Sequence, residues 1–241
     1  MNTMDSNFTE KKLHNLYMDF PSQFLHGTFL AEGKTRFLCS VLMDGVKHEC
    51  YVPSSAKLSK YMKLDSKPVL LTLNKGTKNR TEYSLFAVQH KNQYVILNLR
   101  VANILVGQML LTKRAFRVRP LAIKKEVYIN GYKTDFLLDT PVPTIVEVKS
   151  VLSLQKECCF PDKNSNRTFQ QLEQLEFLLK QGLNAQYYFV SLSPFVRTIV
   201  LEAAFSTLLR RLTHEGLQVF SYRAVFSEND VKLKPIQLSF N

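Results

Sequence analysis

The stretch that decides the fold is Thr134-Asp-Phe-Leu-Leu-Asp139, a break with two prolines, and then Ile145-Val-Glu-Val-Lys149. β-branched and aromatic residues alternate with polar ones on both sides of the break, which predicts two strands joined by a turn. Successive side chains of a strand point to opposite faces, so Glu147 and Lys149 share one face. If the two strands pair as a hairpin, Asp135 comes alongside Glu147.

A patch of two carboxylates and one ammonium allows two interpretations. Neighbouring carboxylates repel unless a cation lies between them, and oxygen ligands of this kind suit magnesium or manganese. Lys149 could then orient or deprotonate a water, or neutralise charge that develops on a phosphate. The alternative is an exposed Glu147–Lys149 pair on an edge strand and an unrelated aspartate, an arrangement that contributes little. The spacing alone leaves both open.

Several short motifs occur in a fixed order around this stretch. An aspartate, a gap of about a dozen residues and Glu-x-Lys in a hydrophobic strand resemble the PD-(D/E)XK nuclease signature. The surrounding sequence beyond residue 25 resembles one branch of it, the sugar fermentation stimulation protein family. The segments that carry this resemblance are Gly27-Thr-Phe-Leu30, Thr35-Arg-Phe-Leu38, Val52-Pro-Ser-Ser-Ala56, Asn103 to Leu110, Asp135-Phe-Leu-Leu138, Val146-Glu-Val-Lys149 and Phe160-Pro-Asp162.

The resemblance implies an α/β fold with a small β-barrel. An N-terminal extension (1–22) would precede an OB-fold-like domain (23–90) and a PD-(D/E)XK nuclease-like mixed-sheet domain (91–241). The implied catalytic residues are Asp135, Glu147 and Lys149. Asp135 and Glu147, with the Val148 carbonyl, would hold Mg²⁺ or Mn²⁺ for phosphodiester hydrolysis. Because the family is best described as DNA-binding and linked to sugar-utilisation genes, a non-catalytic DNA-binding regulator with the same fold is the alternative.

Two amides bear on these alternatives. Residues 101–111 have helical spacing and match a family helix that often carries a glutamate of the nuclease site, but this chain has Gln108 there. An amide ligates a cation more weakly than a carboxylate. In a second predicted helix, 167–181, Arg167 keeps the family's arginine and Gln171 replaces its usual histidine. Both amides favour the non-catalytic alternative, whereas the intact Asp135 and its partners oppose it.

The chain is strongly basic, with a formal net charge of +12 and a pI near 9.5. Such a surplus attracts polyanions, and we expect a nucleic acid as partner, DNA in preference to RNA. No strongly amphipathic basic helix favours a membrane surface. A scaffold whose lysines only solubilise it, and a homodimer, stay open. The expected nucleic-acid contacts are Lys57, Lys60, Lys75, Lys78, Arg80, Arg114, Arg117, Arg119, Arg167 and Gln171.

Length and cysteine content limit the number of domains and indicate the compartment of the protein. The chain has 241 residues, of which 45% are hydrophobic, enough for one large or two small cores. No apolar run has membrane-spanning length, and the N-terminus lacks the apolar core of a signal peptide. The four cysteines show no disulfide or zinc spacing, so we expect reduced thiols in an intracellular protein, cytoplasmic or associated with nucleic acid.

The remaining pattern predicts the elements around this centre. Alternating segments and a hairpin signal at Asp44-Gly45 indicate about five barrel strands with one short helical insert. Beyond residue 120 the pattern predicts a three-strand meander and then alternating strands and helices, which form a mixed sheet covered by helices. The predicted ranges are strands 36–43, 46–52, 69–73 and 83–88, helical insert 56–62, meander 126–129, 133–138 and 144–150, strands 186–192, 217–226 and 231–240, and helix 196–213.

Overall fold

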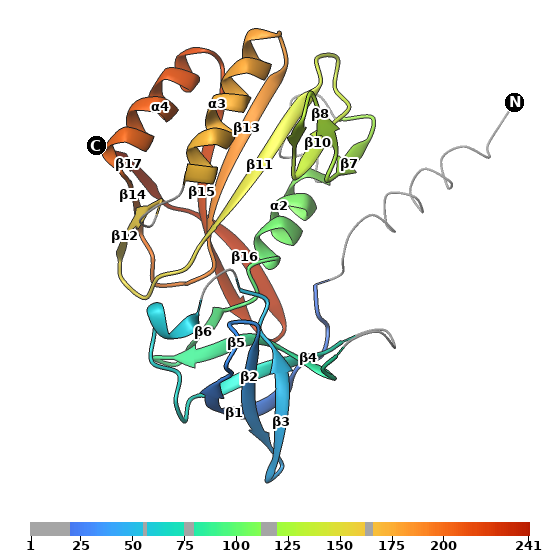
Figure 1. Cartoon of the computed structure of the whole chain (residues 1–241), viewed down its shortest axis with the longest axis vertical. Helices are drawn as coiled ribbons and strands as arrows, with labels where there is room; N and C mark the ends of the chain where they lie inside the picture. The colour runs from blue at the N-terminus through green and yellow to red at the C-terminus, as the bar shows by residue number, and fades with distance from the viewer. Residues whose placement is uncertain (1–19, 55–56, 75–79, 112–119, 162–165) are drawn as a thin grey trace, which may run out of the picture.

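The computed structural model describes residues 20–54, 57–74, 80–111, 120–161 and 166–241, and Figure 1 shows their arrangement. A β-barrel occupies one end of the molecule and a sheet with covering helices the other. Helix α2 (Val101–Leu111) lies between them, over the length predicted from its helical spacing. None of the described helices is both long and apolar enough to cross a membrane.

The barrel is closed by a parallel pairing of its third and fifth strands. Its order is β3-β2-β1-β4-β5, and Cys50 of β3 pairs with Tyr83 of β5 to close the ring. At the predicted hairpin, Asp44 and Gly45 both have positive φ (48° and 78°), the conformation that a tight two-residue turn requires. The strands are β1 (Leu25–Glu32), β2 (Leu38–Met43), β3 (Val46–Tyr51), β4 (Pro68–Leu73) and β5 (Tyr83–His90), and β6 (Gln93–Ile96) extends the sheet beyond β5.

The second sheet is mixed, as predicted. Its central strands β11, β13 and β15 are parallel, and antiparallel strands flank them on both sides. The order is β16 (Asp230–Pro235), β15 (Gln218–Ser227), β13 (Asn184–Ser191), β11 (Thr144–Val151), β10 (Phe136–Leu138) and β7 (Ile123–Lys125). The first predicted meander strand, 126–129, was wrong: β8 (Tyr128–Ile129) pairs with β9 (Tyr132–Lys133) as a separate hairpin. The three-strand meander is instead formed by β7, β10 and β11.

Two helices cover one face of the mixed sheet. Leu172, Leu175 and Leu178 of α3 (Asn166–Lys180) pack with Phe205 and Leu209 of α4 (Ala203–His214) over that face. Their spacing of three and four residues puts these side chains on the sheet side of each helix. Figure 1 shows α3 and α4 side by side on the side away from α2.

The opposite face packs on α2 and on the barrel. One buried cluster contains Phe86 of β5, Val106 of α2 and Val146 of β11, so the core continues from the barrel into the sheet. Phe226 of β15 stands edge-on to Phe86 with ring centroids 5.4 Å apart. This shared core fixes the position of α2 relative to β11. The position of the helix in turn determines which residues the polar side chains of α2 can contact.

Three further predicted elements differ from the structure. The helix predicted from Val196 begins at Ala203, because Thr198–Leu201 forms strand β14 between β12 (Glu157–Phe160) and β17 (Gln237–Phe240). β-branched residues suit such a strand, and tertiary pairing overrode the helical pattern. The strand predicted over 231–240 is split into β16 and β17. In the described part of the helical insert, only a 3₁₀ turn forms, Leu58–Lys60.

Candidate functional site

The candidate site lies where β10 separates from β11. The two strands pair from Leu138↔Thr144 to Phe136↔Val146, and β10 begins there. One residue earlier, the Asp135 carboxylate accepts a 2.8 Å hydrogen bond from the backbone N–H of Val148. A side chain thus takes the place of the strand partner, and Asp135 is held beside Glu147, as the predicted hairpin requires.

Glu147 and Lys149 lie on the same face of β11 and form a buried ion pair. Glu147 is only 3% exposed. Lys149 Nζ donates to Glu147 Oε1 over 2.6 Å and to Oε1 of Gln171, on α3, over 2.5 Å. Breaking a pair this deeply buried would leave one charge without compensation. The ammonium is therefore fixed between strand and helix.

Two tyrosines surround the Glu147 carboxylate. The Tyr132 hydroxyl donates to Glu147 Oε2 over 2.6 Å, so each carboxylate oxygen has a partner. Tyr187 is the neighbour of Glu147 on β13, and its buried hydroxyl has no hydrogen-bond partner among the described residues. The charge of Glu147 is a cause of the raised pKa of both phenols, second to burial.

Burial and the nearby Glu147 charge disfavour ionisation of Asp135. Burial first, and then the negative charge of Glu147, raise the pKa of Asp135 to about 6. The Val148 N–H and the side-chain amide of Asn103, which donates to Asp135 over 2.8 Å, act in the opposite direction. The two carboxylates therefore hold more negative charge than Lys149 and these dipoles compensate.

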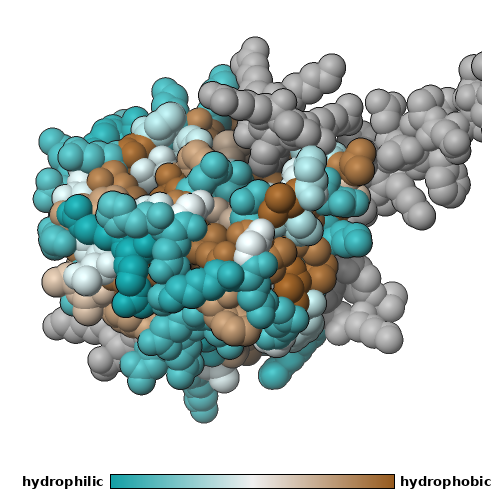
Figure 2. All heavy atoms as spheres, turned by 90° about the horizontal axis from the view of Figure 1, so that it is seen from above, coloured by the Kyte–Doolittle hydropathy of each residue, from teal (hydrophilic) through white to brown (hydrophobic). Residues whose placement is uncertain are grey.

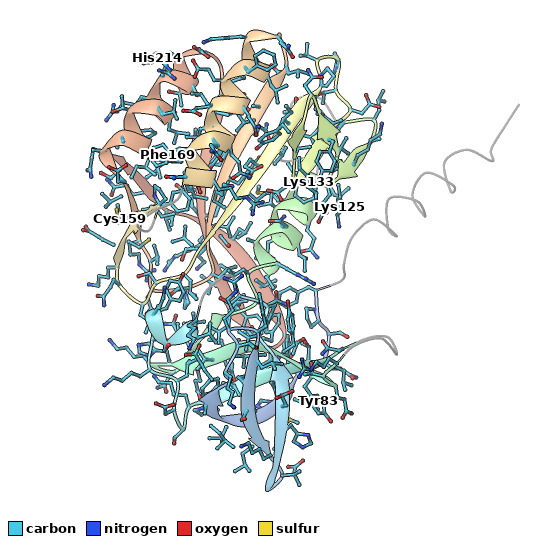
Figure 3. All side chains as sticks on the ribbon, in the orientation of Figure 1. Tyr83, Lys125, Lys133, Cys159, Phe169 and His214 are labelled. Carbon is cyan, nitrogen blue, oxygen red and sulfur yellow. The ribbon has the colours of Figure 1, made fainter. Side chains whose placement is uncertain are left out.

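The residues open into a cleft of about 1020 Å³ between α3 and the β8–β9 hairpin. In Figure 3, Phe169 on α3 and Lys133 on β9 lie on opposite sides of β11. Asn130 donates to Gln181 over 2.8 Å and so joins the hairpin to the segment after α3. Among the described residues that line the cleft, the acidic ones are Glu126, Asp135, Glu147 and Glu173. The basic ones are Lys133, Lys149 and Arg167.

The charge of the described lining is close to balanced, because four acidic residues face three basic ones. The expected contacts Arg114, Arg117 and Arg119 lie outside the described residues, so the charge that they would add is not included. Figure 2, which looks from above onto the end of the molecule shown at the top of Figure 1, likewise shows hydrophilic residues with hydrophobic ones exposed between them. Phe177 of α3 lines the cleft and is 55% exposed. A cleft of this composition attracts a cation more readily than a bare polyanion.

The structure distributes the predicted nucleic-acid contacts over several places. Arg167 and Gln171 line the cleft. Lys57 precedes the barrel's 3₁₀ turn, Lys60 is its last residue, and both are exposed, whereas Arg80 lines a different cavity. The other five expected contacts lie outside the described residues: Lys75, Lys78, Arg114, Arg117 and Arg119.

Sequence reasoning missed three residues of the site: Asn103, Tyr132 and Tyr187. Helix α2 reaches the carboxylates through Asn103, whereas the half-buried Gln108 is not among the described residues that line the cleft. Tyr132 is two residues before the Thr134-Asp135 pair, and only the hairpin brings its hydroxyl back to β11. Tyr187 lies inside an apolar run and was indistinguishable from core.

The donor set fits a hard divalent cation. Among the described residues no group of three or more His, Cys, Asp and Glu could hold a metal. Asp135 and Glu147 nevertheless supply two carboxylates whose mutual repulsion a cation would relieve, and each oxygen keeps a lone pair beyond its hydrogen bond. Mg²⁺ and Mn²⁺ take such oxygens and complete their shells with water or substrate.

Fold and site together define a class: a closed β-barrel fused to a mixed α/β sheet, with an aspartate and a Glu-x-Lys strand at one cleft. The structure resembles that of Pyrococcus furiosus SfsA in complex with Ca²⁺, with a TM-score of 0.75 and 18% identity over 92% of this chain and 99% of the other. The model of the sugar fermentation stimulation protein RE domain matches residues 100–230. The chain belongs to the sugar fermentation stimulation protein family.

Relatives in this family cover most of the chain. The sugar fermentation stimulation protein homolog of Natranaerobius thermophilus is 29% identical over 80% of this chain and 87% of its own length. The homolog of Thermotoga maritima is 27% identical over 83% of this chain and 88% of its own length. The similarity therefore includes the barrel as well as the mixed sheet.

Proposed function

We propose that this protein is a divalent-metal-dependent phosphodiester hydrolase of the PD-(D/E)XK type that acts on nucleic acid, with DNA preferred to RNA. The observation that carries the proposal is the triad at one cleft: Asp135 held beside Glu147, and Lys149 in contact with Glu147. The charge of the buried Glu147 raises the pKa of the half-buried Asp135, so keeping both carboxylates ionised is costly without a cation. The structure of Pyrococcus furiosus SfsA is a complex with Ca²⁺, which supports a divalent ion in this chain as well.

Each described residue then has a distinct role. Asp135 and Glu147 would hold Mg²⁺ or Mn²⁺, which polarises the phosphate and lowers the pKa of a bound water. Lys149 lies beside that position and would orient the attacking water or stabilise charge on the phosphate. Asn103, Tyr132 and Gln171 each donate to or accept from one of these three side chains and so fix its position. Arg167, exposed at the cleft, would contact a neighbouring phosphate.

The test is cleavage of end-labelled single-stranded DNA, duplex DNA and RNA by chelator-treated protein, with Mg²⁺ or Mn²⁺ added back. We expect metal-dependent cleavage that Asp135→Ala and Lys149→Ala each abolish. Two matched controls are exposed residues away from the triad, Asp139→Ala at the far end of β10 and Lys180→Ala at the end of α3. Equal cleavage by the wild type and both triad variants would identify a contaminant and refute the proposal.

One observation favours a second candidate, a non-catalytic nucleic-acid-binding regulator. Lys149 is held by the amide of Gln171, where the family usually has a histidine, so no titratable imidazole stands at this position. In that case duplex DNA would bind without being cleaved. The affinity should still fall steeply as salt rises, because phosphate contacts release counterions. A flat salt response would exclude nucleic acid as the partner in both candidates.

A further inference from the structure

A second cavity lies between the barrel and the first turn of α2. It measures about 770 Å³, within the range of small-molecule sites. Arg100, Val101 and Ile104 form its α2 side, whereas Asn103 of the same helix contacts Asp135. No described residue lines both this cavity and the cleft. The two cavities are therefore lined by different residues.

The charged residues in the described lining of this cavity are all positive. Arg80 and Arg100 are the only charged residues among the described residues that line it. Both are exposed, and neither forms a salt bridge with a described carboxylate. Two guanidinium groups that form no salt bridge within the described part of the chain favour an anion, and a phosphate offers the oxygens that they can bind in pairs.

The rest of the wall is aromatic and apolar. Phe37, Tyr51 and Phe86 line the cavity together with Ile104. Phe37 is 41% exposed, and the guanidinium of Arg36 lies 4.6 Å from its ring centroid. The exposed ring of Phe37 next to cations suits a flat, unsaturated ring, because stacking and phosphate contacts are made together in single-strand binding sites.

Several polar groups of the wall are hydrogen-bonded to one another. Ser84 donates to Asn74 Oδ1 over 2.5 Å, and the amide of Asn74 donates to the carbonyl of Thr81 over 2.8 Å. Asn98 Oδ1 accepts from the backbone N–H of Arg100 over 3.1 Å. These bonds fix the shape of the cavity and use the strongest amide groups of the wall, so that mainly hydroxyl groups are left to contact the edge of a base.

We propose that this cavity binds one nucleotide, with the base against the aromatic wall of Phe37 and Tyr51 and the phosphate between Arg80 and Arg100. The nucleotide is either free or one unit of a single strand, since the chemistry of the contact is the same. The site discriminates weakly between bases, and it operates independently of the metal cleft.

The test measures binding by the full chain in chelator, where hydrolysis does not contribute. The probes are adenosine 5′-monophosphate, adenosine, and a ten-residue single-stranded DNA, each followed by equilibrium dialysis or calorimetry. Arg80→Gln and Arg100→Gln should each raise the dissociation constant about tenfold, as expected for the loss of one charged hydrogen bond. Lys47→Gln, which removes an equal charge from the exposed part of β3, should leave it unchanged.

The three probes distinguish a free nucleotide from one nucleotide unit of a single strand as the ligand. Saturable binding of the monophosphate that both arginine variants weaken identifies a free nucleotide as ligand. An effect confined to the DNA identifies a strand unit. Adenosine binding as tightly as its monophosphate, or arginine variants that behave like Lys47→Gln with every probe, would overturn the proposal. Because both arginines are exposed, these variants should keep the wild-type unfolding midpoint, which is measured in parallel.

Discussion

The Tyr132 hydroxyl lies 2.6 Å from Glu147 Oε2 and donates a hydrogen bond to it, inside a site where Glu147 is almost completely buried. The neutral Tyr132 phenol and the Lys149 ammonium therefore each donate a hydrogen bond to one oxygen of the buried Glu147 carboxylate. The neighbouring Tyr187 is equally buried but has no described hydroxyl partner. The two tyrosines form a natural pair for comparison.

Tyr132→Phe should destabilise the protein, whereas Tyr187→Phe should not. The first change removes a hydrogen bond to a buried charge, and we expect a loss of about 1.5–3 kcal/mol in the free energy of unfolding. The second removes a hydroxyl that was desolvated without compensation, so stability should be unchanged or higher. Urea denaturation measures both, and equal losses would contradict the assignment of the Glu147 partner.

The stability of the metal-free protein should depend on the protonation of Asp135. Its pKa is about 6 in the folded state against an ordinary value of 3.8. The folded state therefore binds this proton more tightly than the unfolded chain does, so the free energy of unfolding falls as pH rises from about 4 to about 6. Asp135→Asn should remove this decline, which amounts to about 3 kcal/mol across the window.

Denaturant midpoints in chelator between about pH 4 and pH 8 test the Asp135 prediction. The control is Asp139→Asn, because Asp139 is exposed at the other end of β10 and should keep the wild-type profile. If Asp135→Asn has the same pH dependence as the wild type, another group is responsible.

Gln171→Ala should slow cleavage if the proposed hydrolase is correct. Lys149 would lose one of its two partners and no longer be held between β11 and α3. A misplaced catalytic group costs about ten- to a hundredfold in rate, mainly in kcat. Single-turnover cleavage with saturating metal measures this effect. Gln93→Ala, an exposed glutamine of β6, should stay within about twofold of the wild type.

The four free thiols should react in an order set by burial. Cys159 is exposed at the edge of the molecule (Figure 3), whereas Cys39 and Cys50 are buried as cross-strand neighbours in the barrel. Burial, and then Cys159, raise the pKa of Cys158 to about 11, so it should react slowly. Iodoacetamide labelling followed by peptide mass spectrometry should find Cys159 first. Labelling of Cys39 or Cys50 in folded protein would contradict the barrel core.

Local signals were enough for most of the fold. The Asp44-Gly45 turn, the alternating strands around it and the helical spacing of 101–111 each act within a few residues, and the structure contains all three. The adjacency of Asp135 and Glu147 was predictable for the same reason, because a short break between two alternating segments permits one hairpin. Strand β14 was not predictable, because its partners come from residues 157–160 and 237–240.

What the sequence determined by itself was the pairing of two strands and the acids that they carry. The tertiary structure alone decided what surrounds those acids: Asn103 arrives from a helix 32 residues earlier, and Tyr132 from a hairpin that bends back. It also decided which charges face the cleft: its described lining has four acidic and three basic residues in a chain of net charge +12. Composition is summed over the whole chain, whereas packing selects the few side chains that face one another.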